Sequence, residues 1–225
     1  MGKVDPKNQL ILALDTATVE EAEGLVEQMD GVVQFFKVGI ILHTLTGAQF
    51  ITGLIKRGKR VFLDLKFFDI ADTVREAVKQ VAGLGVDFLT VHADRQVMKA
   101  AVEGRGNSGL KVLAVTLLTD TSSEDVREMG IDMSPEEVVL CRAKMACGCG
   151  VDGVIASGQE VSAIKKETGD KLLVVTPGVR PFGTSPDGQK RVVTPAEAIK
   201  AGADYIVVGR PIRNAHNPRS AALAI

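Results

Sequence analysis

The sequence predicts a single (β/α)8 barrel, also called a TIM barrel, that spans residues 1–225. Eight short apolar runs alternate with longer amphipathic stretches, and no linker or low-complexity segment interrupts the alternation. The runs are rich in Val, Ile, Leu and Phe, as expected of parallel strands that are covered on both faces. A doubly wound open sheet is the alternative fold for such a pattern, but eight repeats in 225 residues favour the barrel.

The expected strands are the apolar runs at 10–14, 32–36, 60–65, 86–91, 111–116, 151–156, 171–176 and 204–209. Helix starts are marked by hydroxyl side chains that precede proline or acidic residues, namely Thr18, Ser134 and Thr194. Glycines occur where helices are expected to end, at Gly58, Gly85 and Gly202. These signals divide the chain into eight strand–helix units.

The charge balance argues against an affinity for polyanions. The chain has 27 Lys and Arg against 28 Asp and Glu, a net charge of −1, so neither nucleic acid nor an anionic membrane is an expected partner. No apolar run approaches the roughly 18 residues of a membrane-spanning helix, and the first residues are too polar for a signal peptide. We therefore expect a cytoplasmic location.

Three cysteines lie close together in one expected helix, at Cys141, Cys147 and Cys149. Their spacing does not match a zinc ribbon, and no histidine is near in sequence. Buried, reduced thiols are the expected state of all three.

Polar residues follow the predicted strands at their carboxyl ends, where barrel enzymes hold their catalytic side chains. They are Asp15, Lys37, Asp64, Lys66, His92, Thr116, Ser157, Gly178, Arg180, Gly209 and Arg210. Of these, His92 is expected to be a packed structural histidine. The barrel thus has a charged rim on an apolar body, which is typical of an active-site face.

The third strand carries a group of ionisable residues that share one face. Strand alternation places Asp64 and Lys66 on the same side, Asp69 follows in the turn, and Lys37 ends the neighbouring strand. Buried ionic groups are costly unless they meet partners. We therefore expect the four to form an alternating array of cations and anions, rather than a set of solvated surface ion pairs.

Two arginine–glycine segments follow the seventh and eighth strands, the positions at which barrels bind phosphate. Gly178 and Arg180 come after the seventh strand, and Gly209 and Arg210 come after the eighth. Glycine lets backbone N–H groups approach an anion, and arginine offers a planar fork to phosphate oxygens. The polar segment 181–191 is long for such a loop and is expected to be a lid over the ligand.

A glycine motif at 104–109 matches the G-x-G-x-x-G pattern of dinucleotide-binding sites. It follows an expected helix and precedes an expected strand, whereas a dinucleotide site requires the opposite order. We predict a plain helix-to-strand connection there.

The charged segment from Asp64 to Ile70, with Thr73 after it, resembles the signature of the orotidine 5′-phosphate decarboxylase family in its bacterial form. Further matching segments are ALD ending at Asp15, FKVG with Lys37, VTLLT at 115–119, TPGVRP at 176–181, QKRVVTP at 189–195 and YIVVGRPI at 205–212. Phe68 and the pair Ala71-Asp72 depart from the bacterial pattern, and neither position carries a charge of the array.

The resemblance implies decarboxylation of orotidine 5′-monophosphate to UMP, in de novo pyrimidine synthesis, without metal or organic cofactor. It implies that Lys66 donates the proton to C6 of the pyrimidine and that Asp64 lies against the departing carboxylate. It also implies a homodimer, in which Asp69 and Thr73 reach the neighbouring subunit's site.

The remaining roles also follow from the resemblance. The residues expected at the substrate are Asp15 and Lys37 at the ribose hydroxyls, Thr119 at the base, Gln189 between base and phosphate, and Arg180, Gly209 and Arg210 at the phosphate.

Two other functions remain open from the residues themselves. One is a Mg²⁺-dependent sugar-phosphate decarboxylase or aldolase of the same barrel superfamily. The other is a binder of phosphate ligands without catalysis, since barrels can lose chemistry and keep a pocket. The intact set of Lys37, Asp64, Lys66 and Asp69 speaks against the binder.

Overall fold

A computed structural model describes residues 8–181 and 192–225, and it confirms the predicted barrel. Eight strands close in sequence order, and every neighbouring pair is parallel, including the closing pair of first and last strands. Their bounds are β1 (Leu10–Ala13), β2 (Phe35–Gly39), β3 (Arg60–Phe67), β4 (Phe88–His92), β5 (Lys111–Val115), β6 (Gly153–Ile155), β7 (Leu173–Thr176) and β8 (Tyr205–Val208). The pairing of β1 with β8 excludes the open sheet.

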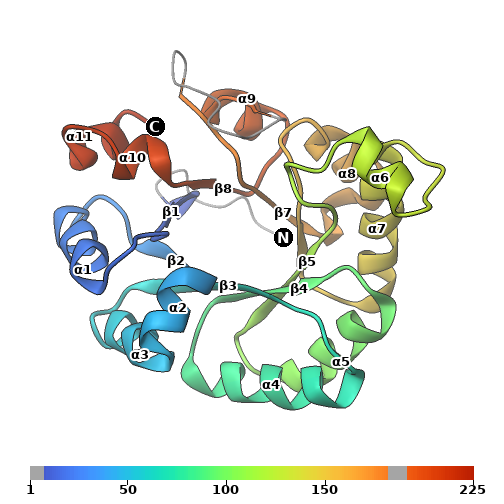
Figure 1. The fold of residues 1–225 in the computed structure, drawn as a ribbon, viewed down its shortest axis with the longest axis horizontal. Coiled ribbons are helices and arrows are strands. Elements are labelled where there is room, and N and C mark those ends of the chain that lie inside the picture. The colour runs from blue at the N-terminus through green and yellow to red at the C-terminus, as the bar shows by residue number, and fades with distance from the viewer. Residues whose placement is uncertain (1–7, 182–191) are drawn as a thin grey trace.

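Helices form the outer ring around the strands (Figure 1). They are α1 (Val19–Gln28), α2 (Ile40–Thr46), α3 (Ala48–Lys56), α4 (Ala71–Leu84), α5 (Arg95–Arg105), α6 (Ser123–Glu128), α7 (Pro135–Cys149), α8 (Val161–Thr168), α9 (Pro195–Lys200), α10 (Arg210–Arg213) and α11 (Pro218–Leu223), with a 3-10 turn η2 (Gly169–Lys171). Ser134 and Thr194 form capping boxes, as their sequence contexts predict. Gly85 ends α4 in the left-handed conformation.

The second strand begins three residues later than predicted. Val32 and Val33 donate their backbone N–H groups to the Met29 carbonyl, at 2.9 and 3.0 Å, so they belong to the turn that follows α1. Pairing starts only at Phe35, opposite Arg60. The run at 32–36 was predicted to be a strand throughout because Val32 and Val33 are apolar. Residues of a turn between a helix and a strand can be as apolar as those of the strand itself, so composition does not mark the start of the strand.

The core has two layers. Most apolar side chains lie between the strands and the helices, and a smaller cluster fills the inside of the barrel. Phe35, Phe88 and Tyr205 pack edge to face in this inner cluster, and the Arg60 guanidinium lies 4.0 Å from the centroid of the Phe35 ring. These residues begin their strands, so the amino end of the barrel is filled and the carboxyl mouth is left for a site.

Three aspartates, each two residues after a glycine, precede β4, β6 and β8. Their carboxylates accept backbone N–H groups of the preceding strand: Asp87 from Val61 at 3.0 Å, Asp152 from Val112 at 2.8 Å, and Asp204 from Val174 at 2.7 Å. A cation pairs with each, namely Arg60, Arg105 and Lys165. The aspartates thereby fix neighbouring strands to each other at the amino end of the barrel.

Two further sequence predictions meet different outcomes. The connection at 104–109 does join α5 to β5, and Gly104 lies so close to α4 that a Cβ there would be 2.3 Å from the Arg75 carbonyl oxygen. The three cysteines are free, but the prediction that all are buried is correct only for Cys149, since Cys147 is half-buried and Cys141 is exposed. None of the helices in the described ranges is long and apolar enough to cross a membrane.

Replacement of Asp204 by alanine is expected to lower the free energy of unfolding by about 1–3 kcal/mol. The substitution leaves the Val174 N–H without its acceptor and the Lys165 ammonium without its carboxylate. Urea denaturation followed by circular dichroism measures the change. Glu23→Ala removes a surface ion pair with Arg57 and is the control, with an expected change below about 0.5 kcal/mol. Equal effects of the two variants would contradict the role given to Asp204.

Candidate active site

The carboxyl mouth of the barrel contains a cleft made of two adjoining cavities, of about 620 and 260 Å³. Both cavities are lined by Lys37, Asp64, Lys66, Pro177 and Val207, so these residues lie where the two join. The larger cavity extends toward the ends of β7 and β8, and the smaller one toward the end of β5. The ionic residues of β2 and β3 therefore lie in the middle of an elongated cleft.

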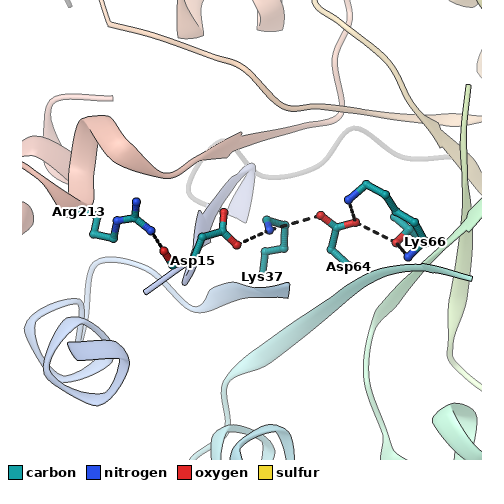
Figure 2. Close-up of polar contacts among 6 residues, drawn as sticks. Asp15, Lys37, Asp64, Lys66 and Arg213 are labelled. Carbon is teal, nitrogen blue, oxygen red and sulfur yellow. Dashed lines mark hydrogen bonds and ion pairs between the residues drawn. The ribbon is translucent and has the colours of Figure 1, made fainter. Parts of the chain in front are cut away.

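Four ionic side chains form an alternating chain across this junction (Figure 2). The Lys37 ammonium lies between two carboxylates, 2.8 Å from Asp15 Oδ1 and 3.3 Å from Asp64 Oδ2. The Lys66 ammonium lies 2.9 Å from Asp64 Oδ1. We call Asp15, Lys37, Asp64 and Lys66 the charged array.

Burial and neighbouring charges act in opposite directions on the centre of the array. Burial lowers the pKa of the Lys37 ammonium, but the Asp64 and Asp15 carboxylates outweigh this effect and raise the pKa above its usual value. For Asp64, burial raises the pKa of the carboxyl, and the ammonium groups of Lys37 and Lys66 outweigh it and lower the pKa. Lys37 thus stays protonated to higher pH than usual, and Asp64 stays ionised to lower pH.

Strand alternation is not what brings Asp64 and Lys66 together. The β3–β4 register shifts between Leu63 and Phe67, and Lys66 has a φ of 50°, the single positive value among non-glycine residues in the described part of the chain. The two side chains meet as predicted, but they do so through a local irregularity of the strand.

The residues that were predicted to bind phosphate line the larger cavity. Gly178, Arg180, Gly209 and Arg210 are all part of its wall, beside Arg213. Thr119 lines the smaller cavity at the other end. The cleft therefore has a cationic end and a smaller end near β5, with the charged array between them.

Asp69 does not take part in the array of its own chain. It is exposed, its carboxylate accepts the Ile70 N–H at 2.7 Å, and among the described residues Asp15 supplies the second anion of the array instead. Thr73 is likewise exposed, in the first turn of α4. Gln189, and segment 182–191 of the predicted lid, lie outside the described residues.

Three residues of the site are missing from the sequence-based set. A Cβ at Gly39 would lie 2.8 Å from Asp15 Oδ1 and 3.1 Å from Lys37 Nζ, so a larger residue there would displace the ends of these two side chains. The Arg213 guanidinium donates to the backbone carbonyl of Asp15 (Figure 2). The buried Thr90 hydroxyl donates to Asp64 Oδ1 at 2.9 Å. Only Gly39 has a sequence signal, its place two residues after Lys37 at the end of the same strand.

His92 ends β4 beside the site, as predicted, and its ring packs edge to face against Phe68 with 5.4 Å between centroids. Burial lowers the pKa of His92, and the positive charges of Lys66 and Arg142 lower it further. Within residues 8–181 and 192–225, no group of three His, Cys, Asp or Glu side chains is placed to hold a metal ion.

Comparison with known proteins identifies the family. A family model described as "Orotidine 5'-phosphate decarboxylase / HUMPS family" matches residues 8–225. A relative from Nitrobacter winogradskyi, named orotidine 5'-phosphate decarboxylase, is 51% identical over 219 residues, which cover 97% of this chain and 91% of the relative. One of the same name from Bradyrhizobium diazoefficiens is 45% identical over 224 residues, covering 100% and 94%.

A solved structure agrees with these relatives. The crystal structure of orotidine 5'-phosphate decarboxylase from Lactobacillus acidophilus superposes with a TM-score of 0.84 at 38% identity, and the match covers 96% of each chain. The resemblance found in the sequence is thereby confirmed at the level of the family. On fold, sequence and the arrangement of the cleft, this chain belongs to the orotidine 5′-phosphate decarboxylase / HUMPS family.

Proposed function

We propose that this chain decarboxylates orotidine 5′-monophosphate to UMP in de novo pyrimidine biosynthesis, with Lys66 as the proton donor and without metal or organic cofactor. One observation carries the proposal: the charged array lies at the junction of a cavity with arginines and a smaller cavity. The family and the names of the relatives support the same reaction. The cytoplasmic location belongs to this proposal as the place of a pyrimidine-pathway enzyme.

The cleft accommodates a mononucleotide in one orientation. In this proposal the phosphate binds Arg180, Arg210 and the backbone of Gly209, in the larger cavity. The ribose hydroxyls meet Asp15 and Lys37, which form the wall between the cationic end and Lys66. The base then enters the smaller cavity, where Thr119 is its polar partner. The role of Gln189 between base and phosphate is implied by the resemblance alone, because Gln189 lies outside the described residues.

The reaction requires stabilisation of a localised negative charge. When the bond from C6 to the carboxylate breaks, CO₂ leaves and the electron pair stays on C6, where no ring carbonyl accepts it by simple resonance. Enzymes lower barriers by ~8–23 kcal/mol, and this reaction requires the upper part of that range. A fixed ammonium beside C6 stabilises the developing charge without reorganisation of solvent.

Lys66 meets this requirement by its position in the array. Its ammonium lies at the junction of the two cavities, 2.9 Å from Asp64. A proton passes from Lys66 Nζ to C6 as the carbon–carbon bond breaks, and water later returns a proton to the amine. Asp64, which Lys37 and Lys66 keep ionised, lies on the side of the departing carboxylate. Binding of the remote phosphate holds the base against these charges.

A homodimer is part of the proposal because Asp69 lies outside its own chain's array. Its neighbours Phe68 and Ile70 are 68% and 73% exposed, and adjacent exposed apolar side chains of this size are typical of a surface that another protein covers. In this proposal a second copy of the chain covers them, and Asp69 and Thr73 enter that copy's cleft.

Replacement of Lys66 by alanine is expected to lower kcat at least about 10³-fold, because both charge stabilisation and proton donation are lost. Binding of UMP, which lacks the carboxylate, is expected to change less than about threefold, since the phosphate contacts remain. Loss of orotidylate absorbance and equilibrium titration measure the two quantities. Lys144→Ala, on the exposed face of α7, is the control. Substantial turnover by Lys66→Ala would refute Lys66 as the acid.

Treatment with EDTA is expected to leave kcat/KM unchanged within about twofold, because the proposed steps use only side chains of the protein. The measurement compares the enzyme before and after dialysis against the chelator, with and without added Mg²⁺. Loss of activity that Mg²⁺ restores would instead favour the metal-dependent sugar-phosphate enzyme. An enzyme that binds UMP but has no activity before dialysis would favour the phosphate-ligand binder.

Mixing two inactive variants is expected to restore activity if Asp69 acts in the neighbouring site. Lys66→Ala and Asp69→Ala, after subunit exchange, form hybrid dimers with one intact site, which gives roughly a quarter of wild-type activity. The matched control mixes Lys66→Ala with Asp64→Ala, because both residues serve the site of their own chain and no intact site forms. Equal results from the two mixtures would contradict the shared site.

A further inference from the structure

Thr90 is a buried side chain of β4 that touches two residues of the charged array. It is 0% exposed and lies two residues after Phe88, which belongs to the cluster inside the barrel. Side chains two residues apart in a strand share a face, so Thr90 also points into the barrel. Its hydroxyl accepts the Lys66 backbone N–H at 2.9 Å and donates to Asp64 Oδ1 at 2.9 Å. The same carboxylate oxygen lies 2.9 Å from Lys66 Nζ. One hydroxyl therefore links the backbone of the lysine to its counter-ion.

This link occurs where the strand departs from regular geometry. The register of β3 with β4 is interrupted between Leu63 and Phe67, and the Lys66 N–H bonds to the Thr90 side chain. Lys66 has a φ of 50°, a left-handed conformation that a side chain with a Cβ disfavours. Such a conformation persists only where the surroundings determine it. The hydrogen bond from the Lys66 backbone to Thr90 is a contact that does so.

We propose that Thr90 is a positioning residue, whose hydroxyl holds Lys66 in its left-handed conformation and orients the Asp64 carboxylate toward it. The inference rests on the proposed function in taking Lys66 as the proton donor. Because Thr90 binds Asp64 through Oδ1, Oδ2 remains directed at Lys37, and the array keeps its alternation. Threonine suits the task because its branched Cβ restricts χ1 in a strand.

Two substitutions separate the hydroxyl from the shape of the side chain. Thr90→Val keeps the volume and the branched Cβ but removes the hydroxyl, and Thr90→Ser keeps the hydroxyl. Thr168→Val is the matched control, because Thr168 in α8 is also buried, lines neither cavity, and donates its hydroxyl to a backbone carbonyl, that of Ile164, at 2.8 Å. All three variants leave the arginines of the larger cavity in place.

Thr90→Val is expected to lower kcat roughly 10²-fold, as misplacement of a reacting group does, with UMP affinity changed less than about threefold. Thr90→Ser is expected to recover kcat to within about tenfold of wild type, and Thr168→Val to stay within about threefold. A merely structural role would lower stability in both valine variants and would not separate kcat from UMP binding. Wild-type kcat in Thr90→Val, or equal losses in the two valine variants, would overturn the proposal.

Crystal structures of wild type and Thr90→Val give a readout that does not depend on turnover. The expected result is a negative φ at Lys66 and a broken Lys66–Asp64 contact in the variant. An unchanged φ and contact would overturn the role of Thr90, whether or not the chain decarboxylates orotidylate. A wild-type protein that does not consume orotidylate, with the geometry altered as expected, would instead refute the proposed function and leave the positioning role standing.

Discussion

The constraint on which the site depends is the compensation of buried charge. The Lys37 side chain is only 10% exposed, and such an ammonium is stable in an apolar barrel only when carboxylates replace its hydration. The two carboxylates that contact Lys37 belong to Asp15, which follows β1, and to Asp64, which lies in β3. The register of β1, β2 and β3 must therefore bring the carboxyl ends of these strands to the same level along the barrel axis. The observed register does this by pairing Ala13 with Lys37 and Gly39 with Asp64. The pairing of β1 with β2 and of β2 with β3 therefore assembles the array.

The two ends of the barrel divide stability and chemistry between them. At the amino end, the aromatic cluster fills the interior, and Asp87, Asp152 and Asp204 tie β3 to β4, β5 to β6 and β7 to β8. At the carboxyl end, the interior is open and the side chains are ionic. A strained residue such as Lys66 is tolerated at the open end because the strands beneath it are already fixed.

Local patterns predicted most of the fold and the outline of the site, and they failed where the outcome depends on contacts between distant segments. Apolar runs and capping residues are local, so strands and helices followed from them. The contact between Lys37, Asp64 and Lys66 also followed, because parallel strands bring their carboxyl ends to one rim. The left-handed Lys66, the Thr90 hydroxyl and the Arg213 contact did not, because each depends on a residue from another strand or from the far end of the chain. Asp15 was predicted to bind the ribose hydroxyls. Its membership in the charged array was not predicted, because its contact with Lys37 depends on the pairing of β1 with β2.

In the proposed function, the separation of charge along the cleft orients one mononucleotide. The array contains two cations and two anions and is neutral as a unit, so it exerts little net attraction on an anion at a distance. The arginines at the ends of β7 and β8 form the cationic end of the larger cavity, and in this proposal they attract the phosphate dianion first. With the phosphate held, the base can extend only past the array and into the smaller cavity. A neutral array therefore serves orientation as well as chemistry: a net positive array would compete for the phosphate and hold the ligand in the wrong register.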